Sequence, residues 1–314
     1  MVARETFSLG AAGRAANQRL AWTASLLIVL AACAPSARPA VKIGLVAPFV
    51  GRYREIGEEV VYAVRLAVRE ANEAGGVHGY SIELMAYDDE GDPELAAEQA
   101  RKLAIDPQVV GAVGHWLDAT TLAAAPVYAA SGITLLATTA SPELDRAALR
   151  LWYTDAAYAS AGGCPLPCDP AANLAWLKTR TSVNGPTVGP ATWGLNLFPG
   201  LAGDLAEGVE AVVPAPLPGD STDPDFARRY QAVASGAQAR FLAVLAYDAT
   251  RLLISAIGAS IEAQGTPSRA AVAAALRRAD YEGLSGHFSF DSEGNWPGAR
   301  AWLYRWDKGE LVRP

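Results

Sequence analysis

Residues 109–121, with the sequence VVGAVGHWLDATT, hold the side chains of this chain that are best suited to chemistry. His115 and Asp118 lie three residues apart and could form an acid–base pair or bind a metal ion. A catalytic site needs a third group that orients the first two, and none is visible in the sequence. The other histidines, His78 and His287, fall in no recognisable nucleophile elbow, P-loop or zinc motif. We therefore expect a protein that binds rather than an enzyme, with no metal site and no cofactor.

An apolar run leads into these polar residues. VVGAVG (109–114) predicts a buried strand, and a helix is expected near 119–130. Asp118 stands at the junction, where its carboxylate is expected to cap the helix by accepting from backbone N–H groups near Thr120 and Thr121. A strand that ends on polar residues indicates a binding site, because ligands of parallel α/β proteins lie beyond the carboxyl ends of the strands.

Strands and helices alternate along this part of the chain. Asp92 before Pro93 supplies an N-cap and a first-turn proline for one of the helices. The alternation predicts an α/β fold, with a parallel sheet covered by helices on both faces. Strands are expected at 41–48, 81–88, 109–114 and 133–138, and helices at 55–74 and 94–104.

Length and composition limit the possible functions further. A chain of 314 residues with 51% hydrophobic residues can bury a large core, and its length suggests two domain-sized units. The formal net charge is −7 and the sequence has no basic stripe. A nucleic acid partner is therefore not expected, since such a surface repels phosphate backbones.

The N-terminus is typical of an export signal. Arg14 and Arg19 precede the apolar run LAWTASLLIVLAAC (20–33), which is too short to span a bilayer comfortably. Its end, Leu30 to Cys33, resembles the bacterial lipobox, in which the cysteine carries lipid; an ordinary secretory signal with a chance cysteine is the alternative. We expect a signal peptide over 1–32, a tether over 33–40, and a protein outside the cytoplasm that is anchored to a membrane through Cys33.

Two further cysteines, Cys164 and Cys168, lie in the segment CPLPCDP. In an oxidising compartment, two close cysteines most simply form a local disulfide. A metal site is the alternative, but it would need further Cys or His ligands nearby, and there are none. We expect a disulfide.

A family resemblance rests on seven ordered blocks: KIGLVAPFVGRY, GEEVVYAVRLAVREANEAGGVHG, YDDEGDPELAAEQARKLA, VGAVGHWLDATTLAAAPVYAASGITLLATTASPEL, GPATWGLNLFPGLAGDLAEGV, AYDATRLLISAI and GLSGHFSFDSEGN. In this order they resemble the Leu/Ile/Val-binding family of extracytoplasmic solute-binding proteins, which deliver ligands to ABC transporters. The match covers most of residues 41–314. It implies the type I periplasmic-binding-protein fold, with two α/β lobes, parallel sheets flanked by helices, and a ligand cleft that closes by a hinge.

One departure from the family pattern is large. Members have two or more further βα units between the block matching TTASPEL (138–144) and the strand that here reads LRLWYTD (149–155), whereas only DRAA (145–148) separates them in this chain. A βα unit with its return strand needs about 30 residues. We therefore expect a complete first lobe, over 41–144 and 215–284, and a reduced second lobe, over 145–214 and 285–314.

The resemblance also implies positions for ligand contacts. In members that bind amino acids, a hydroxyl in the loop matching GHWLDATT holds the α-carboxylate, and an acid of the second lobe holds the ammonium. These two positions fall on Asp118 and Ala191 in this chain. Thr138, Thr139 and Ser141 still offer hydroxyl and backbone N–H groups for a ligand.

Aromatic residues are expected to form the walls of the site. Tyr53, Trp116 and Trp193, together with Tyr158, could supply apolar or stacking surfaces. Packing within the lobes is an equally good explanation for each of them.

These substitutions predict the kind of ligand. A carboxylate at Asp118 repels a ligand carboxylate by about 1 to 4 kcal/mol at close range. We expect weak or absent binding of leucine, isoleucine and valine, and preference for an amide, an amine or a polyol over an amino acid.

The expected function is that of a solute-binding protein of a branched-chain-amino-acid-type ABC transporter, with a small polar organic ligand and a permease as partners. A ligand-sensing lipoprotein or a truncated paralogue that does not transport is the alternative.

Overall fold

The first half of the chain folds as alternating strands and helices, as its apolar runs predict. The computed structural model describes residues 38–139, 141–153, 158, 174–175, 177–178, 187–234 and 236–314. Cys33, Cys164 and Cys168 lie outside the described residues, as do the signal peptide and most of the tether. The expected lipidation and disulfide therefore stay predictions.

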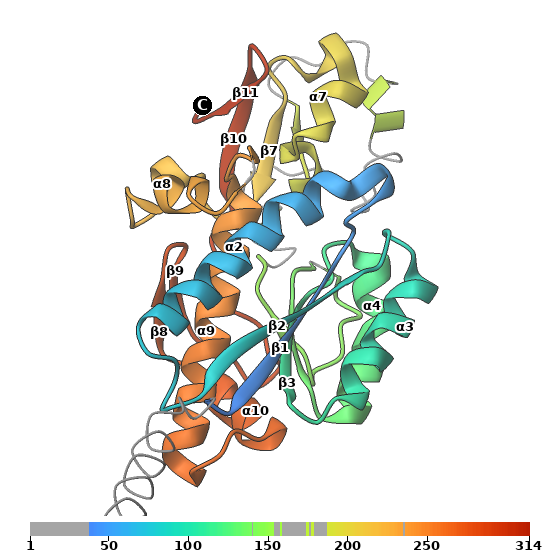
Figure 1. Ribbon diagram of the computed structural model, residues 1–314. Helices are drawn as coiled ribbons and strands as arrows, with labels where there is room; N and C mark the ends of the chain where they lie inside the picture. The colour runs from blue at the N-terminus through green and yellow to red at the C-terminus, as the bar shows by residue number, and fades with distance from the viewer. Residues whose placement is uncertain are drawn as a thin grey trace, which may run out of the picture. The chain divides into compact units, whose positions relative to one another are not determined.

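Five parallel strands form the first sheet, in the order β2-β1-β3-β4-β5. All six residues of β3 are buried, which fits a central strand covered on both faces. This confirms the predicted α/β class (Figure 1). The strands are β1 (Ala40–Ala47), β2 (Ser81–Asp88), β3 (Val109–Gly114), β4 (Thr134–Ala137) and β5 (Leu149–Arg150).

Helices cover both faces of this sheet. On one face α3 (Pro93–Ile105) packs beside α4 (Asp118–Ser131), and their alanine-rich sides form one cluster of buried residues. On the other face α2 (Arg54–Glu73) packs beside α9 (Phe241–Gln264), which also contacts α10 (Arg269–Arg277). The start of α3 follows the prediction, because the Asp92 carboxylate accepts from the backbone N–H of Glu94 at 2.8 Å and of Leu95 at 2.9 Å.

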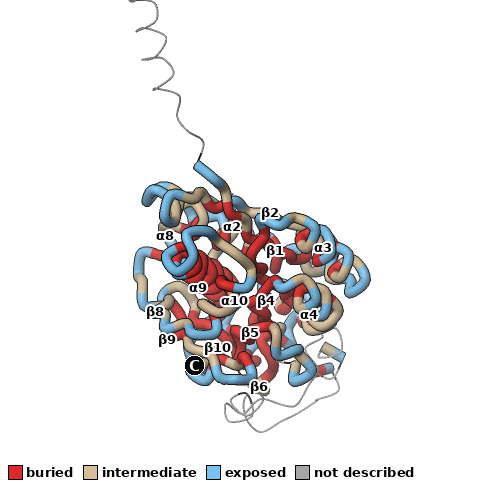
Figure 2. The backbone as a smooth tube through the Cα atoms, turned by 90° about the horizontal axis from the view of Figure 1, so that it is seen from below, coloured by how far each residue is buried: buried red, intermediate tan, exposed pale blue. Residues whose placement is uncertain are grey.

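Helix α9 is largely apolar. By length and composition it could cross a membrane, but 83% of its apolar window is buried inside the protein. Figure 2 shows it as a buried element among exposed outer turns. Its composition is that of a core helix.

A second, smaller sheet has four strands in the order β11-β10-β7-β6. β10 (Trp302–Asp307) pairs antiparallel with both β7 (Glu210–Val213) and β11 (Glu310–Val312), and β6 (Val188–Gly189) pairs parallel with β7. A short helix, α7 (Leu197–Ala202), and three 3-10 turns, η2 (Ala191–Gly194), η3 (Gly203–Ala206) and η4 (Pro218–Asp220), accompany them. The indole of Trp193 stacks on Phe198 at 5.4 Å between ring centroids, inside this part of the chain.

The sheets differ from the expected lobe boundaries in two places. β5 pairs with β4, so residues 149–150 extend the first sheet beyond the boundary expected at residue 144. The hairpin of β8 (Tyr281–Gly283) and β9 (Gly286–Phe288) crosses the boundary expected after residue 284, and β8 packs on α9. The remaining helical segments are η1 (Gly51–Tyr53) and α8 (Phe226–Gln231). The rest of the lobe division stays an expectation.

Candidate functional site

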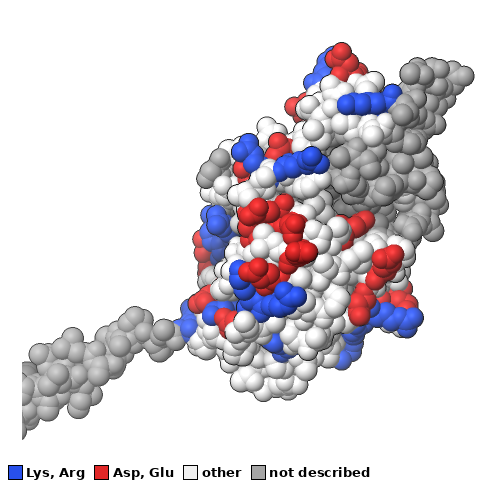
Figure 3. All heavy atoms as spheres, turned by 90° about the vertical axis from the view of Figure 1, so that its right-hand side faces the viewer, with Lys and Arg blue, Asp and Glu red and all other residues white. Residues whose placement is uncertain are grey.

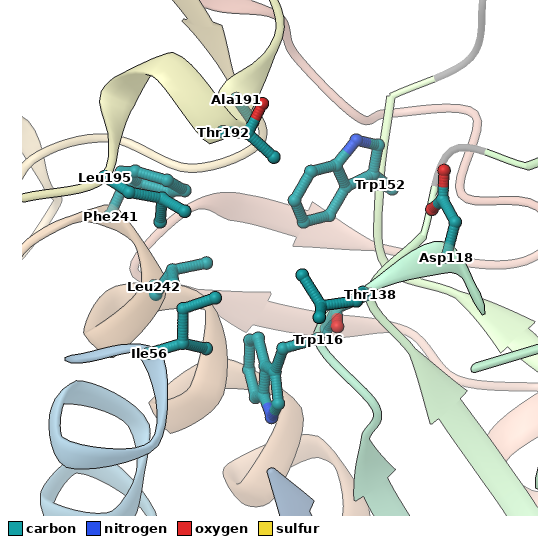
Figure 4. A pocket seen from close by; sticks show the side chains of 11 residues that line it. Ile56, Trp116, Asp118, Thr138, Trp152, Ala191, Thr192, Leu195, Phe241 and Leu242 are labelled. Atoms are coloured by element: carbon teal, nitrogen blue, oxygen red, sulfur yellow. The ribbon is translucent and has the colours of Figure 1, made fainter. Parts of the chain in front are cut away.

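A cavity lies beyond the carboxyl ends of β3 and β4, where the polar loop of the sequence was expected to form a site (Figure 4). It has about 390 Å³ of space free of atoms, part of which is open to solvent. Segments that follow strands of both sheets, together with the starts of α2 and α9, contribute to its walls. The residues that line it are Ile56, Trp116, Leu117, Asp118, Thr138, Trp152, Ala191, Thr192, Leu195, Phe241 and Leu242.

Asp118 lines this cavity but does not cap the helix as predicted. Leu117 occupies the N-cap position in extended conformation, and Asp118 is the first residue of α4. The carboxylate of Asp118 instead accepts a hydrogen bond from the hydroxyl of Thr139, which follows β4. The prediction was wrong because Thr139, just after the end of the neighbouring strand β4, supplies a hydroxyl donor that the sequence around Asp118 does not contain.

The two threonines after β4 are held by contacts within the protein. The Thr138 hydroxyl donates to the backbone carbonyl of His115 at 2.6 Å. The Thr139 hydroxyl donates to Asp118 and accepts from the backbone N–H of Ser141 at 3.1 Å. Ser141 and Thr139 lie outside the lining group, so of these three residues Thr138 alone reaches the cavity.

His115 is fully buried and pairs with Asp89, not with Asp118. Its Nδ1 lies 2.7 Å from Oδ2 of Asp89, and its Nε2 lies 3.3 Å from the hydroxyl of Tyr128. Burial, and then the negative charge of Asp89, raise the pKa of Tyr128 above its usual range. The hydroxyl therefore keeps its proton, and both ring nitrogens of His115 lie within hydrogen-bond distance of a buried polar partner. His115, Asp89 and Tyr128 thus hold the residue that follows β3 in a buried set of contacts. None of the three lines the cavity.

The opposite wall comes from the 3-10 turn η2, which follows β6 of the second sheet, and from two helix starts. Ala191 lines the cavity from η2, so a methyl group stands where the family resemblance places an acid. Phe241 and Leu242 enter from the first turn of α9, and Ile56 from the first turn of α2.

A buried carboxylate fixes the start of α9. Glu59 on α2 accepts from the backbone N–H of Arg240 at 3.1 Å and of Ala243 at 2.7 Å. Burial raises the pKa of Glu59 to about 7, although the hydrogen bond from Ala243 and the charge of Arg240 oppose the shift. The side chain of Glu59 thereby positions the turn that carries Phe241 and Leu242.

The aromatic residues expected at the site divide into two groups. The indole of Trp116 lines the cavity and is 6% exposed. Tyr53 packs against Gly91, Trp193 is fully buried against Phe198, and Tyr158 stacks on Tyr153 at 5.8 Å between centroids. These three rings lie outside the lining group, and their contact with a ligand stays a prediction.

Sequence reasoning missed several residues of the wall. Trp152, which directly follows β5, lines the cavity and is 7% exposed. The indole N–H groups of Trp116 and Trp152 have no acceptor in the part of the chain that the structure describes. Trp152 follows the end of a strand, which is a position where ligands bind in parallel sheets. This position indicates a cavity residue only after β5 is known to pair with β4. Ile56, Leu195, Phe241 and Leu242 carried no signal beyond apolarity.

The wall of the cavity carries little charge. Among the described residues that line the cavity, Asp118 is the only charged side chain. Elsewhere, Figure 3 shows acidic and basic side chains interspersed on the face it presents, with no continuous basic area among the described residues. Within the described part of the chain, no three His, Cys, Asp or Glu side chains gather as a metal site would require.

The fold has a parallel sheet, a smaller second sheet and an apolar cavity at the strand ends between them. This arrangement is that of a protein of the solute-binding class. The chain belongs to the periplasmic binding protein family, whose model matches residues 40–163 and 168–310. Membership implies a location outside the cytoplasm.

Curated relatives match over part of their length. An "Amino acid binding protein" of Pseudomonas aeruginosa is 32% identical over 93 residues, which are 30% of this chain and 25% of the relative. A "Leucine-, isoleucine-, valine-, threonine-, and alanine-binding protein" of the same organism is 31% identical over 114 residues, which are 36% of this chain and 30% of the relative. The matches thus span about a quarter to a third of these relatives.

Solved structures match over nearly the whole described fold. The branched-chain amino acid transporter substrate binding protein of Streptococcus pneumoniae, in complex with isoleucine, has a TM-score of 0.70 at 18% identity, covering 87% of this chain and 97% of that one. An ABC transporter substrate-binding protein of Desulfitobacterium hafniense, in complex with leucine, has a TM-score of 0.70 at 20% identity, covering 87% and 99%. At these identities the similarity establishes the fold.

Proposed function

We propose that this protein is the solute-binding protein of an ABC transporter of the branched-chain-amino-acid type and that it performs no chemistry. The cavity between the two sheets is the observation that carries the proposal, because both parts of the chain wall it and domain closure would bury a ligand there. His115 supports the non-enzymatic function, since it is buried with Asp89 and Tyr128 and does not line the cavity.

We further propose that lipid on Cys33 anchors the mature chain to the outer face of a membrane. The lipobox resemblance at Leu30–Cys33 and the family's location outside the cytoplasm support this arrangement. A permease in that membrane is the proposed partner.

The ligand is proposed to be a small organic molecule other than a branched-chain amino acid. Three features support this. Ala191 provides no carboxylate for an α-ammonium group, the hydroxyl of Thr138 already donates to His115, and the hydroxyl of Thr139 already donates to Asp118. The cavity also presents mostly apolar side chains, as pockets for organic ligands usually do.

Native mass spectrometry of the purified protein tests the binding function by detecting a small molecule that co-purifies. Calorimetry with that molecule should then give one site per chain. Trp152→Ala should weaken its binding by about tenfold or more, because the indole forms a wall of the cavity. Trp302→Ala is the matched control, since Trp302 lies on β10 outside the lining group, and it should change the Kd by less than about twofold. Equal effects of both variants would contradict the proposed site.

A further inference from the structure

We propose that the cavity selects an uncharged organic molecule that carries one aromatic ring. The inference rests on the proposed solute-binding function and names the class of ligand for that site. It follows from the polar side chains of the wall, which are already engaged inside the protein, and from the aromatic side chains that surround the space.

The polar side chains of the wall have partners within the chain. The carboxylate of Asp118 accepts from the Thr139 hydroxyl, and the hydroxyl of Thr138 donates to the backbone carbonyl of His115 at 2.6 Å. Asp118 and Thr192 also interact elsewhere in the chain. A polar or charged ligand group would therefore compete with contacts that these side chains already make.

A charged head group would lose its water without gaining a full set of partners. Lys, Arg and His are missing from the described lining residues, so a ligand carboxylate meets no cation there. An ammonium group meets a methyl group at Ala191 and, at Asp118, a carboxylate that already holds another donor. Burial of an ion without its own partners costs far more than burial of an uncharged group. The wall thus disfavours anions, cations and zwitterions.

Aromatic side chains stand on several sides of the space. Trp116 follows β3, Trp152 follows β5, and Phe241 begins α9. In the view of Figure 4, Trp152 lies above the middle of the group and Trp116 below it, with Phe241 to the left. Aromatic pairs that stack or meet edge to face gain more than the burial of their area alone. The arrangement therefore favours a ligand with an aromatic ring.

The two indoles present carbon to this space. Figure 4 shows the nitrogen of Trp116 on the side away from the other labelled side chains, and the six-membered ring of Trp152 directed toward the middle of the group. Ile56, Leu195 and Leu242 add aliphatic surface. A ligand gains most here by burying apolar area.

The size of the cavity suits a single ring. An apolar cavity of about 150 Å³ is large enough to bind benzene. The cavity of this protein has about 390 Å³ of space free of atoms, part of which is open to solvent. One aromatic ring with a short substituent therefore fits.

Five compounds test the inference by calorimetry on the purified protein. Four share a phenyl body and differ in charge: 3-phenylpropanamide, phenylalanine, 2-phenylethylamine and 3-phenylpropanoate. The uncharged amide should bind about tenfold or more tightly than each of the other three. The fifth, 3-cyclohexylpropanamide, has a saturated ring of similar size, and it should bind about threefold or more weakly than the phenyl amide.

Two variants test the role of the indoles. Trp116→Leu and Trp152→Leu keep the wall apolar, and in each the two amides should bind within about twofold of one another. Trp302→Leu is the matched control, because Trp302 lies on β10 outside the lining group, and it should keep the preference for the phenyl ring.

The outcomes separate this inference from the proposed function. Tightest binding of phenylalanine, the amine or the carboxylate overturns the inference and leaves the solute-binding function standing, and so does equal binding of the two amides. Failure of all five compounds to bind, with no co-purifying molecule, overturns both. If neither indole variant folds, the order of the five compounds on the unmodified protein decides the matter by itself.

Discussion

The unmodified protein should lose stability as the pH rises, and replacing Glu59 with Gln should abolish this pH dependence. Glu59 is buried at the start of α9, and burial raises the pKa of its carboxyl group from 4.5 to about 7. Between these two values the folded protein holds a proton that the unfolded chain has released. The free energy of unfolding therefore falls as the pH rises through this window. The contribution is fully present below about pH 4.5 and is lost above about pH 7.

The size of the effect follows from the pKa difference. Each pKa unit corresponds to about 1.4 kcal/mol, so a shift from 4.5 to about 7 gives at most about 3 kcal/mol. Asp248, whose pKa burial raises to about 6, contributes a background of the same sign. The difference between the variant and the unmodified protein isolates the part that belongs to Glu59, because Asp248 is present in both.

Urea unfolding at pH values from about 5 to 8 is the assay. Glu59→Gln keeps a side-chain oxygen that can accept from Arg240 and Ala243, so the variant should fold and its stability curve should be flatter by about 2 to 3 kcal/mol over this range. Glu58→Gln, an exposed neighbour on α2, is the control and should follow the unmodified protein. A Glu59→Gln curve parallel to that of the unmodified protein would refute the reasoning.

Three further predictions concern the anchor and the second sheet. Cys33→Ser should move the protein from the membrane to the soluble fraction after cell fractionation, and retention in the membrane would count against a lipid anchor. Trp193→Ala should lower the free energy of unfolding by about 3 to 5 kcal/mol in urea, because the indole is fully buried against Phe198; a loss below about 1 kcal/mol would contradict its core role. Amide hydrogen exchange should be faster in β7 and β10 than in β1 and β3, since fewer buried contacts hold the smaller sheet, and uniform protection would argue against this difference.

The sequence by itself predicted the first sheet closely. Strands expected at 41–48, 81–88, 109–114 and 133–138 are found at 40–47, 81–88, 109–114 and 134–137. Apolar runs, the cap at Asp92 and the following Pro93 are local signals, and they act on the backbone within a few residues. The same strand ends indicated where the cavity lies, and Trp116, Asp118 and Thr138 line it, while their contact with a ligand stays a prediction.

The second part of the chain was less predictable, because its partners are distant in sequence. β5 joins β4 in the first sheet, and this pairing brings Trp152 to the cavity. The packing of α2 on α9 places Ile56, Phe241 and Leu242 at the opposite wall. Apolar residues at helix starts look alike in sequence whether they face a ligand or a core.

Side-chain partners were decided only by the tertiary structure. His115 pairs with Asp89, 26 residues away, rather than with Asp118, and the carboxylate of Asp118 accepts from Thr139 rather than capping its own helix. Trp193 and Tyr53 carried the same sequence signal as Trp116, yet both pack within the protein. Sequence determines which groups can donate, accept or stack, whereas the folded chain determines which of them have already found partners inside the protein and which remain directed at the cavity.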